Sequence, residues 1–334
     1  MKKAAGFIVK LSVIVFVLFI IFLLIADRFV QFRMDDQEYK AYFAQKGLSP
    51  SIGYYNSLNR KIRYAESGRD TSATILFIHG APSSLSYYRD YMSDSLLLQK
   101  ATMFAVDRAG YGYSGLGKPE PSIEKQVQMI VPVVDSLNKI HHPLIVVGAS
   151  YGTAIACRLS MDYPNLVDGL VLIAPALAPG EEKTYWFTSM IESPLLNWFI
   201  PRMLQSANTE KIHHRSELTK MLPYWSNIKV PVIYLQGAND ELVYTTNAKF
   251  AQTHLINAPY LSIEMIPGEG HLIAFSQKKK IEGSIVKMLD LAKLNIAGKL
   301  HRDSTMRVAQ REIDDFIPPK NVDFFPKISQ KTNY

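Results

Sequence analysis

The fold of this chain is decided by the stretch Leu144-Ile145-Val146-Val147-Gly148-Ala149-Ser150-Tyr151-Gly152. Its apolar half predicts a buried β-strand, and residues 153–161 are compatible with a helix that follows at once. The two glycines permit a sharp turn and a close approach of neighbouring backbone. A strand-to-helix turn of this kind leaves the serine hydroxyl exposed at its apex. Ser150 is therefore our candidate nucleophile for attack on a carbonyl carbon.

Strand-like and helix-like segments alternate on both sides of this turn. The expected strands are residues 52–56, 62–66, 74–78, 102–106, 144–147, 170–174, 230–236 and 261–266. Segments of helical spacing include residues 83–99, 123–140 and 272–294. Short apolar strands separated by helices predict an α/β fold with a mainly parallel central sheet that is covered by helices on both faces.

One interval, residues 176–228, breaks the alternation. It contains no strand-like run but holds every tryptophan of the chain, namely Trp186, Trp198 and Trp225. We expect a small helical cap here, above the carboxyl edge of the sheet. The tryptophans either line an apolar substrate pocket or pack the cap onto the sheet, and the sequence leaves both alternatives open.

Two more side chains would complete a serine-based centre for acyl transfer. His271 lies in a glycine-containing loop after the last strand and is the candidate base. Asp240 follows the preceding strand and is the candidate carboxylate that orients the base, although Glu241 is adjacent to it. The carboxyl ends of parallel strands meet at one edge of a sheet, so we expect these side chains to meet Ser150 there.

The oxyanion that forms during acyl transfer also needs hydrogen-bond donors. The strand at residues 74–78 ends in His79-Gly80-Ala81-Pro82. The backbone N–H groups of Ala81 and Tyr151 are the expected donors, each worth about 3 kcal/mol of barrier in comparable sites. His79 is expected to orient this loop. Such chemistry requires neither a cofactor nor a metal ion, because a histidine activates the hydroxyl and backbone donors meet the charge.

Together, these motifs resemble the α/β-hydrolase superfamily, in its capped serine hydrolase branch. The resemblance extends from about residue 53 to residue 294 and includes the segment Asp107-Arg108-Ala109-Gly110-Tyr111-Gly112-Tyr113-Ser114-Gly115. It implies a Ser150, Asp240, His271 triad in that chain order. Asp107 and Arg108 are expected to fix the loop after them by local hydrogen bonds. Haloalkane dehalogenases and epoxide hydrolases share the His-Gly-x-Pro loop but place an aspartate at the elbow, so Ser150 implies cleavage of an acyl compound.

The N-terminus adds an apolar segment, residues 4–26, in which Lys10 is the only charged residue. About 20 apolar residues cross a bilayer. A cleaved signal peptide would require small residues at both positions before the cleavage site, but Leu24 stands at one of them. We therefore expect a transmembrane signal-anchor at 1–30, a juxtamembrane linker or short helix at 31–51, the hydrolase domain at 52–297 and a polar tail at 298–334.

Charge gives limited information about topology and partners. Lysines at 2, 3 and 10 precede the uninterrupted apolar run at residues 11–26, and Arg28, Arg33 and Lys40 follow it. This distribution favours a cytoplasmic N-terminus, and with it an extracytoplasmic domain, only slightly. The net charge of +7 comes from scattered lysines and arginines, so we expect no nucleic-acid partner. The single cysteine, Cys157, excludes an internal disulfide.

The sequence thus predicts a membrane-anchored serine hydrolase that cleaves a carboxylic ester, with a small-molecule or lipid-like acyl substrate. An aminopeptidase or amidase, a perhydrolase with the same triad, and a ligand-binding receptor on this fold are the alternatives. An aminopeptidase would need a cap carboxylate that binds the substrate's amino group. The candidates for it are Glu181, Glu182, Glu192, Glu210 and Glu217.

Overall fold

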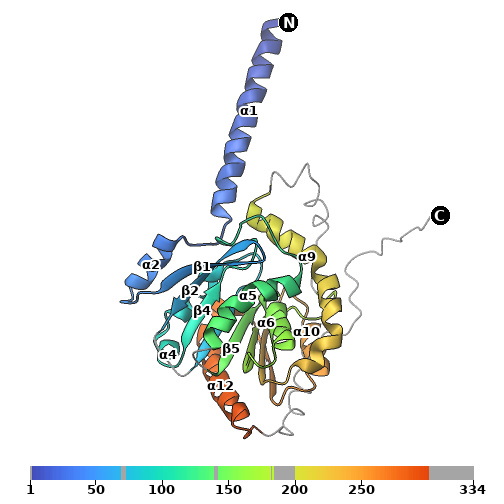
Figure 1. Ribbon diagram of the computed structural model, residues 1–334. Helices are drawn as coiled ribbons and strands as arrows, with labels where there is room; N and C mark the ends of the chain where they lie inside the picture. The colour runs from blue at the N-terminus through green and yellow to red at the C-terminus, as the bar shows by residue number, and fades with distance from the viewer. Residues whose placement is uncertain (1, 69–72, 139–141, 182, 184–199, 301–334) are drawn as a thin grey trace, which may run out of the picture.

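The computed structural model describes residues 2–68, 73–138, 142–181, 183 and 200–300. One sheet of eight strands organises the domain (Figure 1). The strands are β1 (Ser51–Ser57), β2 (Arg60–Ser67), β3 (Thr74–Ile78), β4 (Thr102–Val106), β5 (Leu144–Ala149), β6 (Gly169–Ile173), β7 (Val232–Gly237) and β8 (Leu261–Ile266). Their order across the sheet is β1-β2-β4-β3-β5-β6-β7-β8. The pairs β1–β2 and β2–β4 are antiparallel, and all the others are parallel.

Helices fill the connections between these strands. The α-helices are α1 (Lys2–Phe29), α2 (Asp36–Ala44), α3 (Arg89–Met92), α4 (Ser95–Leu98), α5 (Ile123–Asn138), α6 (Tyr151–Asp162), α9 (Arg202–Met221), α10 (Thr246–His254), α11 (Ile273–Ser276) and α12 (Lys278–Ile296). Two 3₁₀ helices are η1 (Leu85–Tyr88) and η2 (Leu222–Asn227). The mainly parallel α/β architecture expected from the sequence is confirmed, and every expected strand forms within two residues of its expected ends.

Two of the expected helices are divided. The segment 83–99 forms η1, α3 and α4, because the Asp94 side chain accepts hydrogen bonds from the backbone N–H groups of Leu96 and Leu97 and so starts a new helix. The segment 272–294 is interrupted at Gln277, whose backbone (φ −116°, ψ 32°) lies outside the helical region. Hydrophobic spacing predicts the buried face of such segments but not these local interruptions.

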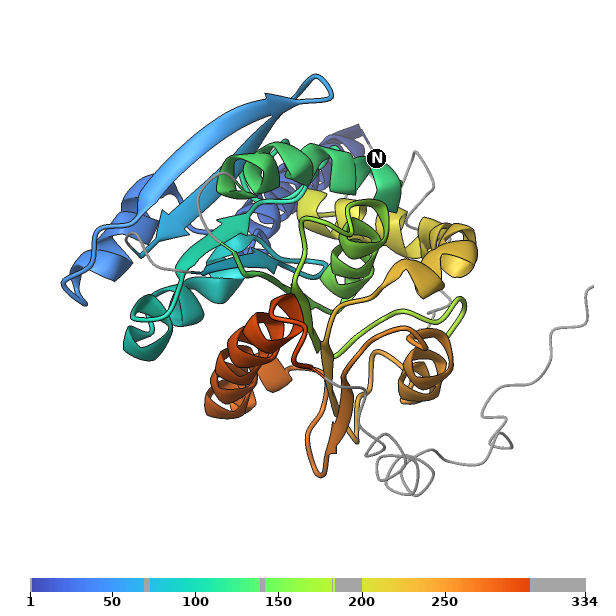
Figure 2. The ribbon, with the colours of Figure 1, turned by 60° about the horizontal axis from the view of Figure 1, so that its bottom comes forward.

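Alternating strand residues build two cores, one on each face of the sheet. In β3, Leu76 and Ile78 pack on the face covered by α5, α6 and α10, whereas Ile75 and Phe77 pack on the face covered by η1, α3 and α12. Figure 2 shows α12 separated from α5 and α6 by the sheet. A strand that is buried on both faces explains why these runs are continuously apolar.

Helix α1 projects away from the domain (Figure 1). The stretch Lys10–Phe29 has a mean hydropathy of 2.7 and none of it is buried, so it is long and apolar enough to cross a membrane. A membrane anchor and a signal sequence both fit this description. The next helix, α2, packs against the domain through Tyr39 and Phe43, which are fully buried.

The end of α1 is joined to the start of the cap helix α9. The carboxylate of Asp27 accepts hydrogen bonds from the backbone N–H of Arg202 at 2.7 Å and from the guanidinium of Arg202 at 2.7 Å. In Figure 1, α9 begins beside the foot of α1. The Asp27 side chain of the apolar helix therefore binds both the backbone and the side chain of Arg202, the first residue of α9.

Candidate active site

The turn between β5 and α6 holds Ser150 in an unusual backbone conformation. Its φ of 51° and ψ of −123° are unfavourable for a residue with a Cβ. The surrounding bonds fix it, because the Ser150 N–H donates to Ile173 O at 2.8 Å and Ser150 O accepts from Thr153 N at 2.9 Å. Strain that is held in this way is typical of functional turns.

Gly152 brings this turn against the end of β3. A Cβ at this position would lie 2.3 Å from the carbonyl oxygen of Ile78 and 2.7 Å from that of His79, both of them backbone atoms. Only glycine permits this approach. As a result, the start of α6 and the loop after β3 lie side by side at Ser150.

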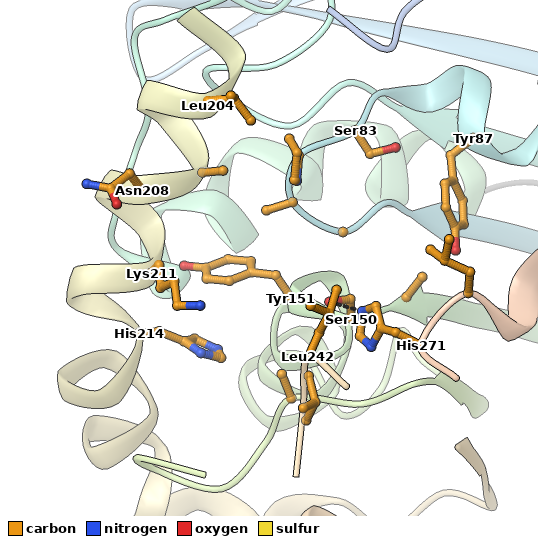
Figure 3. A pocket seen from close by; sticks show the side chains of 18 residues that line it. Ser83, Tyr87, Ser150, Tyr151, Leu204, Asn208, Lys211, His214, Leu242 and His271 are labelled. Carbon is orange, nitrogen blue, oxygen red and sulfur yellow. Dashed lines mark hydrogen bonds between the residues drawn. The ribbon is translucent and has the colours of Figure 1, made fainter. Parts of the chain in front are cut away.

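Three side chains from different loops form a hydrogen-bonded line at the carboxyl edge of the sheet. Ser150 Oγ lies 3.0 Å from His271 Nε2. His271 Nδ1 lies 3.0 Å and 2.9 Å from the two carboxylate oxygens of Asp240. Ser150 follows β5, Asp240 follows β7 and His271 follows β8, so parallel strands bring the three together as expected. Figure 3 shows Ser150 and His271 meeting at the wall of a cavity.

The geometry distinguishes Asp240 from the adjacent Glu241. The Asp240 carboxylate also accepts from the backbone N–H groups of Leu242 and Val243, each at 2.9 Å. Burial raises the pKa of Asp240, but the hydrogen bond and charge of His271 and the two backbone donors outweigh it, and the net pKa is lowered. Glu241 instead accepts from the backbone N–H of His271 at 3.3 Å and does not contact its ring.

The loops that carry Asp240 and His271 are in direct contact. A Cβ on Gly237 would lie 2.2 Å from the carbonyl oxygen of Gly270 and 2.3 Å from that of Glu269. The backbone N–H of Asn239 donates to Glu269 O at 2.9 Å. This packing sets the distance between the carboxylate and the imidazole before any substrate binds.

The backbone N–H groups of Ala81 and Tyr151 lie at the same cavity as Ser150. Both residues line it, and within the described ranges neither N–H donates to a protein acceptor. Figure 3 shows Tyr151 next to Ser150. The two donors expected from the sequence are thus available to an oxygen atom bound next to the serine.

His79 holds the loop of Ala81 rather than facing the cavity. Its buried ring accepts from Arg108 N through Nε2 at 3.0 Å and donates from Nδ1 to the carbonyl oxygen of Gly80 at 2.7 Å. These two bonds define a neutral tautomer, because a backbone N–H can only donate and a carbonyl can only accept. Burial, with the nearby charge of Arg108, lowers the pKa of His79 well below its ordinary value.

Asp107 behaves as expected, whereas Arg108 differs from the sequence expectation. Asp107 accepts from the backbone N–H of Tyr113 at 2.8 Å and so fixes the loop that follows it. The side chain of Arg108 makes no local bond of this kind but extends to His79, Gly80 and the cap. Its partners are distant in the chain, and no local pattern points to them.

The cavity beside Ser150 has a volume of about 430 Å³, within the usual range of small-molecule sites. Its wall is mostly apolar and comes from the loops after β3, β5, β7 and β8 and from the cap helix α9. The lining residues are Gly80, Ala81, Pro82, Ser83, Tyr87, Ala149, Ser150, Tyr151, Ala176, Leu204, Ala207, Asn208, Lys211, His214, Leu242, Val243, His271 and Leu272.

Of the three tryptophans that the sequence offered for the pocket, only Trp225 lies among the described residues. Trp186 and Trp198 lie outside the described residues. Trp225 does not line the cavity: it is buried and its ring packs edge to face against Phe250 of α10, at 5.2 Å between ring centroids. Of the two alternatives that the sequence left open, packing of the cap onto the domain is the one that the contacts of Trp225 favour.

The sequence reasoning missed the face of α9 that does line the cavity. Leu204, Ala207, Asn208, Lys211 and His214 come from successive turns of this helix, and Figure 3 shows it along one side of the cavity, opposite Ser83 and Tyr87. Their spacing of three or four residues is the signal that predicts one helix face. It was available in the sequence, but the polar residues among them weakened it.

Residues 69–224 match the family described as serine aminopeptidase, S33. Among curated proteins, "Epoxide hydrolase 1" of Caenorhabditis elegans is 27% identical over 160 residues, which cover 46% of this chain and only 39% of that relative. Among solved structures, a membrane phospholipase A described as a bacterial virulence factor has a TM-score of 0.57 at 18% identity and covers 88% of this chain and 99% of its own. Haloalkane dehalogenase DbeA from Bradyrhizobium elkani has a TM-score of 0.56 at 18% identity and covers 74% of this chain and 100% of its own.

The chain has the α/β-hydrolase fold, and nearly half of it matches the serine aminopeptidase family model. This agrees with the eight-stranded, mostly parallel sheet and with the resemblance seen in its sequence motifs. The solved structures share the fold of this chain at low identity. Its reaction must therefore be argued from its own site.

Proposed function

We propose that this α/β hydrolase is a serine hydrolase that cleaves a carboxylic ester through an acyl-enzyme. The observation that carries the proposal is the hydrogen-bonded line from Ser150 Oγ through His271 to Asp240, at the wall of a mostly apolar cavity. In this proposal Ser150 is the nucleophile, His271 is the base and then the acid, and Asp240 orients the imidazole.

The proposed reaction proceeds in two halves. Ser150 Oγ attacks the ester carbonyl carbon while His271 Nε2 takes the hydroxyl proton, and the N–H groups of Ala81 and Tyr151 bind the oxyanion. Collapse of the tetrahedral intermediate breaks the bond to the alcohol oxygen, which receives the proton from His271. Water then attacks the acyl-enzyme with His271 again as base, and the second collapse returns the proton to Ser150 and releases the carboxylic acid.

Asp240 has a specific task in this scheme. The carboxylate can only accept hydrogen bonds, so the imidazole must carry its proton on Nδ1 and keep Nε2 free to accept from Ser150. The carboxylate also stabilises the positive charge that the ring gains after it takes the proton.

A serine at the elbow also favours acyl substrates over epoxides or alkyl halides. Attack of a carboxylate on an alkyl carbon gives an ester, which water can cleave to complete the turnover. Attack of Ser150 on the same carbon would give an alkyl ether, which water does not cleave under enzyme conditions. The similarity to an epoxide hydrolase and to a dehalogenase is therefore taken as a similarity of fold.

The aminopeptidase alternative needs a cap carboxylate that can bind an ammonium group. Of the candidates, Glu181 accepts from Thr246 at 2.6 Å, Glu210 is buried in an ion pair with Arg108, and Glu217 accepts from Ile123 N at 3.1 Å. Glu182 and Glu192 lie outside the described residues. Because the described candidates already have partners, an ester is the better-supported substrate.

We further propose that the protein is anchored in a membrane by α1, with its catalytic domain on the extracytoplasmic side, and that its substrate is lipid-like. Support comes from the length and hydropathy of Lys10–Phe29 and from the bond between Asp27 and Arg202. Helix α9, which begins at Arg202, also lines the cavity through Leu204. A tether joined to the cavity wall suits a substrate that is drawn from a bilayer.

A fluorophosphonate probe tests the proposed nucleophile on the full-length protein in detergent. We expect covalent labelling of the wild type and none of Ser150→Ala. An unlabelled wild type, or equal labelling of the variant, would refute the serine-hydrolase mechanism and favour a receptor. A series of p-nitrophenyl esters of increasing acyl length then tests the substrate class: hydrolysis should increase with chain length, whereas anilide cleavage without ester cleavage would indicate an amidase.

A further inference from the structure

A buried arginine, Arg108, connects the oxyanion loop to the cap. Its guanidinium Nε donates to His79 O at 2.8 Å, and Nη2 donates to Gly80 O at 2.9 Å. The other N–H groups reach Gln126 at 2.8 Å and both carboxylate oxygens of Glu210, at 2.5 Å and 3.0 Å. All five donors of the fork thus have an acceptor, so its orientation is fixed.

The bond to Gly80 O has a direct consequence for Ala81. The Gly80 carbonyl and the Ala81 N–H belong to one planar peptide unit, and in a trans unit the two groups point in opposite directions. Arg108 and His79 both donate to this carbonyl oxygen, from the side of the domain interior. Holding the oxygen inward therefore directs the N–H outward, into the cavity that Ala81 lines.

Glu210 is the only carboxylate among the described residues that faces this guanidinium. It lies on α9, is fully buried, and also accepts from Tyr111 Oη at 2.6 Å and from Gln126 Nε2 at 2.8 Å. A bidentate carboxylate sets the plane of an arginine more strictly than a neutral acceptor does. The position of α9 is thereby transmitted to the guanidinium.

We propose that Glu210 is a positioning residue for the oxyanion hole. From the cap it holds Arg108, which holds the Gly80 carbonyl and so aims the Ala81 N–H at the developing oxyanion. The inference rests on the proposed serine-hydrolase function. It also means that the oxyanion hole is complete only when α9 is seated on the domain, which couples the cap to the chemistry as well as to substrate binding.

The test compares Glu210→Gln with Glu217→Gln in the full-length protein. Glu217 is also a buried carboxylate of α9, but it bonds to Ile123 N and Lys220 and does not contact Arg108. We expect kcat for ester hydrolysis to fall on the order of 10- to 100-fold in Glu210→Gln, with KM changed by less than about threefold. Affinity for an alkylboronic acid, which forms a tetrahedral adduct with the serine, should fall by a similar factor. Glu217→Gln should retain both.

Since a buried arginine without its carboxylate can destabilise the fold, Glu210→Asp provides a second variant that keeps the charge. Its shorter side chain cannot reach both guanidinium nitrogens from the same backbone position, so kcat and boronate affinity should fall together, with KM retained. Unchanged kcat in a folded, fluorophosphonate-labelled Glu210→Asp or Glu210→Gln would overturn this inference alone. An unlabelled wild type would overturn the proposed function and this inference with it.

Discussion

The exchange Asp240→Asn tests the candidate site most sharply, because it changes one atom type and leaves the shape nearly constant. The carboxylate accepts from the backbone N–H groups of Leu242 and Val243 and from His271 Nδ1. The backbone donors cannot move, so the carboxamide oxygen of the variant should stay with them. Its NH₂ group would then face Nδ1 of the imidazole.

This arrangement reverses the tautomer of the imidazole. A donor opposite Nδ1 favours the ring with its proton on Nε2, and an Nε2 that carries a proton cannot accept from Ser150. We expect kcat to fall by about 10³- to 10⁴-fold, the size seen for the same change in other serine triads, which corresponds to about 4–5.5 kcal/mol of barrier. Stability should fall by a smaller amount, about 1–3 kcal/mol, because the buried side-chain amide of Gln236, which donates to the second carboxylate oxygen at 3.3 Å, would face an NH₂ group instead of an acceptor.

The assay is steady-state hydrolysis of a p-nitrophenyl ester, with thermal unfolding measured on the same samples. Glu241→Gln is the matched control, since Glu241 accepts a hydrogen bond from the backbone N–H of His271 and, among the described residues, does not contact the imidazole ring. Its kcat should stay within about threefold of the wild type. The proposed role of Asp240 in orienting His271 is refuted if Asp240→Asn retains more than a tenth of the wild-type kcat, or if Glu241→Gln loses as much activity as Asp240→Asn.

Three further predictions concern the turn, the effect of pH and the anchor. Gly152→Ala should lower stability by about 1–3 kcal/mol and reduce activity, because its Cβ would lie 2.3 Å from a backbone oxygen. The control is Gly283→Ala on α12, whose Cβ would have no atom within 4 Å and which should be neutral or stabilising in the same thermal melts. Equal losses of stability in the two variants would contradict the steric explanation. Because the pKa of Asp240 is lower in the folded protein than in the unfolded chain, its ionised carboxylate should stabilise the fold above the unfolded-state pKa of about 3.9. This stabilisation should be lost as the pH falls through the folded-state pKa. Urea titrations should therefore show that the difference in unfolding free energy between wild type and Asp240→Asn becomes smaller below about pH 4. A difference that becomes larger there would contradict the lowered pKa of Asp240. Arg202→Ala removes the guanidinium bond to Asp27 and should slow hydrolysis of an ester embedded in vesicles more than that of a soluble ester. The free energy of unfolding should change by less than about 1 kcal/mol. Equal slowing of both reactions would argue against a role at the membrane.

Much of the fold and of the candidate triad could be predicted because the signals are local or ordered along the chain. The apolar runs of β3, β4 and β8 specify strands through their own composition, and the glycines around Ser150 specify a turn that no larger residue could make. Asp240 and His271 follow the last two strands, and parallel pairing gathers the ends of such strands at one edge.

The remaining features depended on contacts between distant segments. The sequence pointed to Asp240 without excluding the adjacent Glu241, and only the fold shows which carboxylate meets the imidazole ring. An aromatic residue such as Trp225 is compatible with a pocket wall or with a core, and its place in η2 puts the side chain in the core. Both choices depend on the direction of a side chain, which composition does not contain.

By itself, the sequence determined the sheet and the turn at Ser150, because each follows from backbone preferences over a few residues, and it gave the chain order of the candidate triad. Only the tertiary structure decided that Arg108 meets Glu210, which lies 102 residues away in the chain. A buried guanidinium requires acceptors on every side, and it takes them from whichever segments the packed cap brings near. For that physical reason, the link between the cap and the oxyanion loop emerges only from the folded protein.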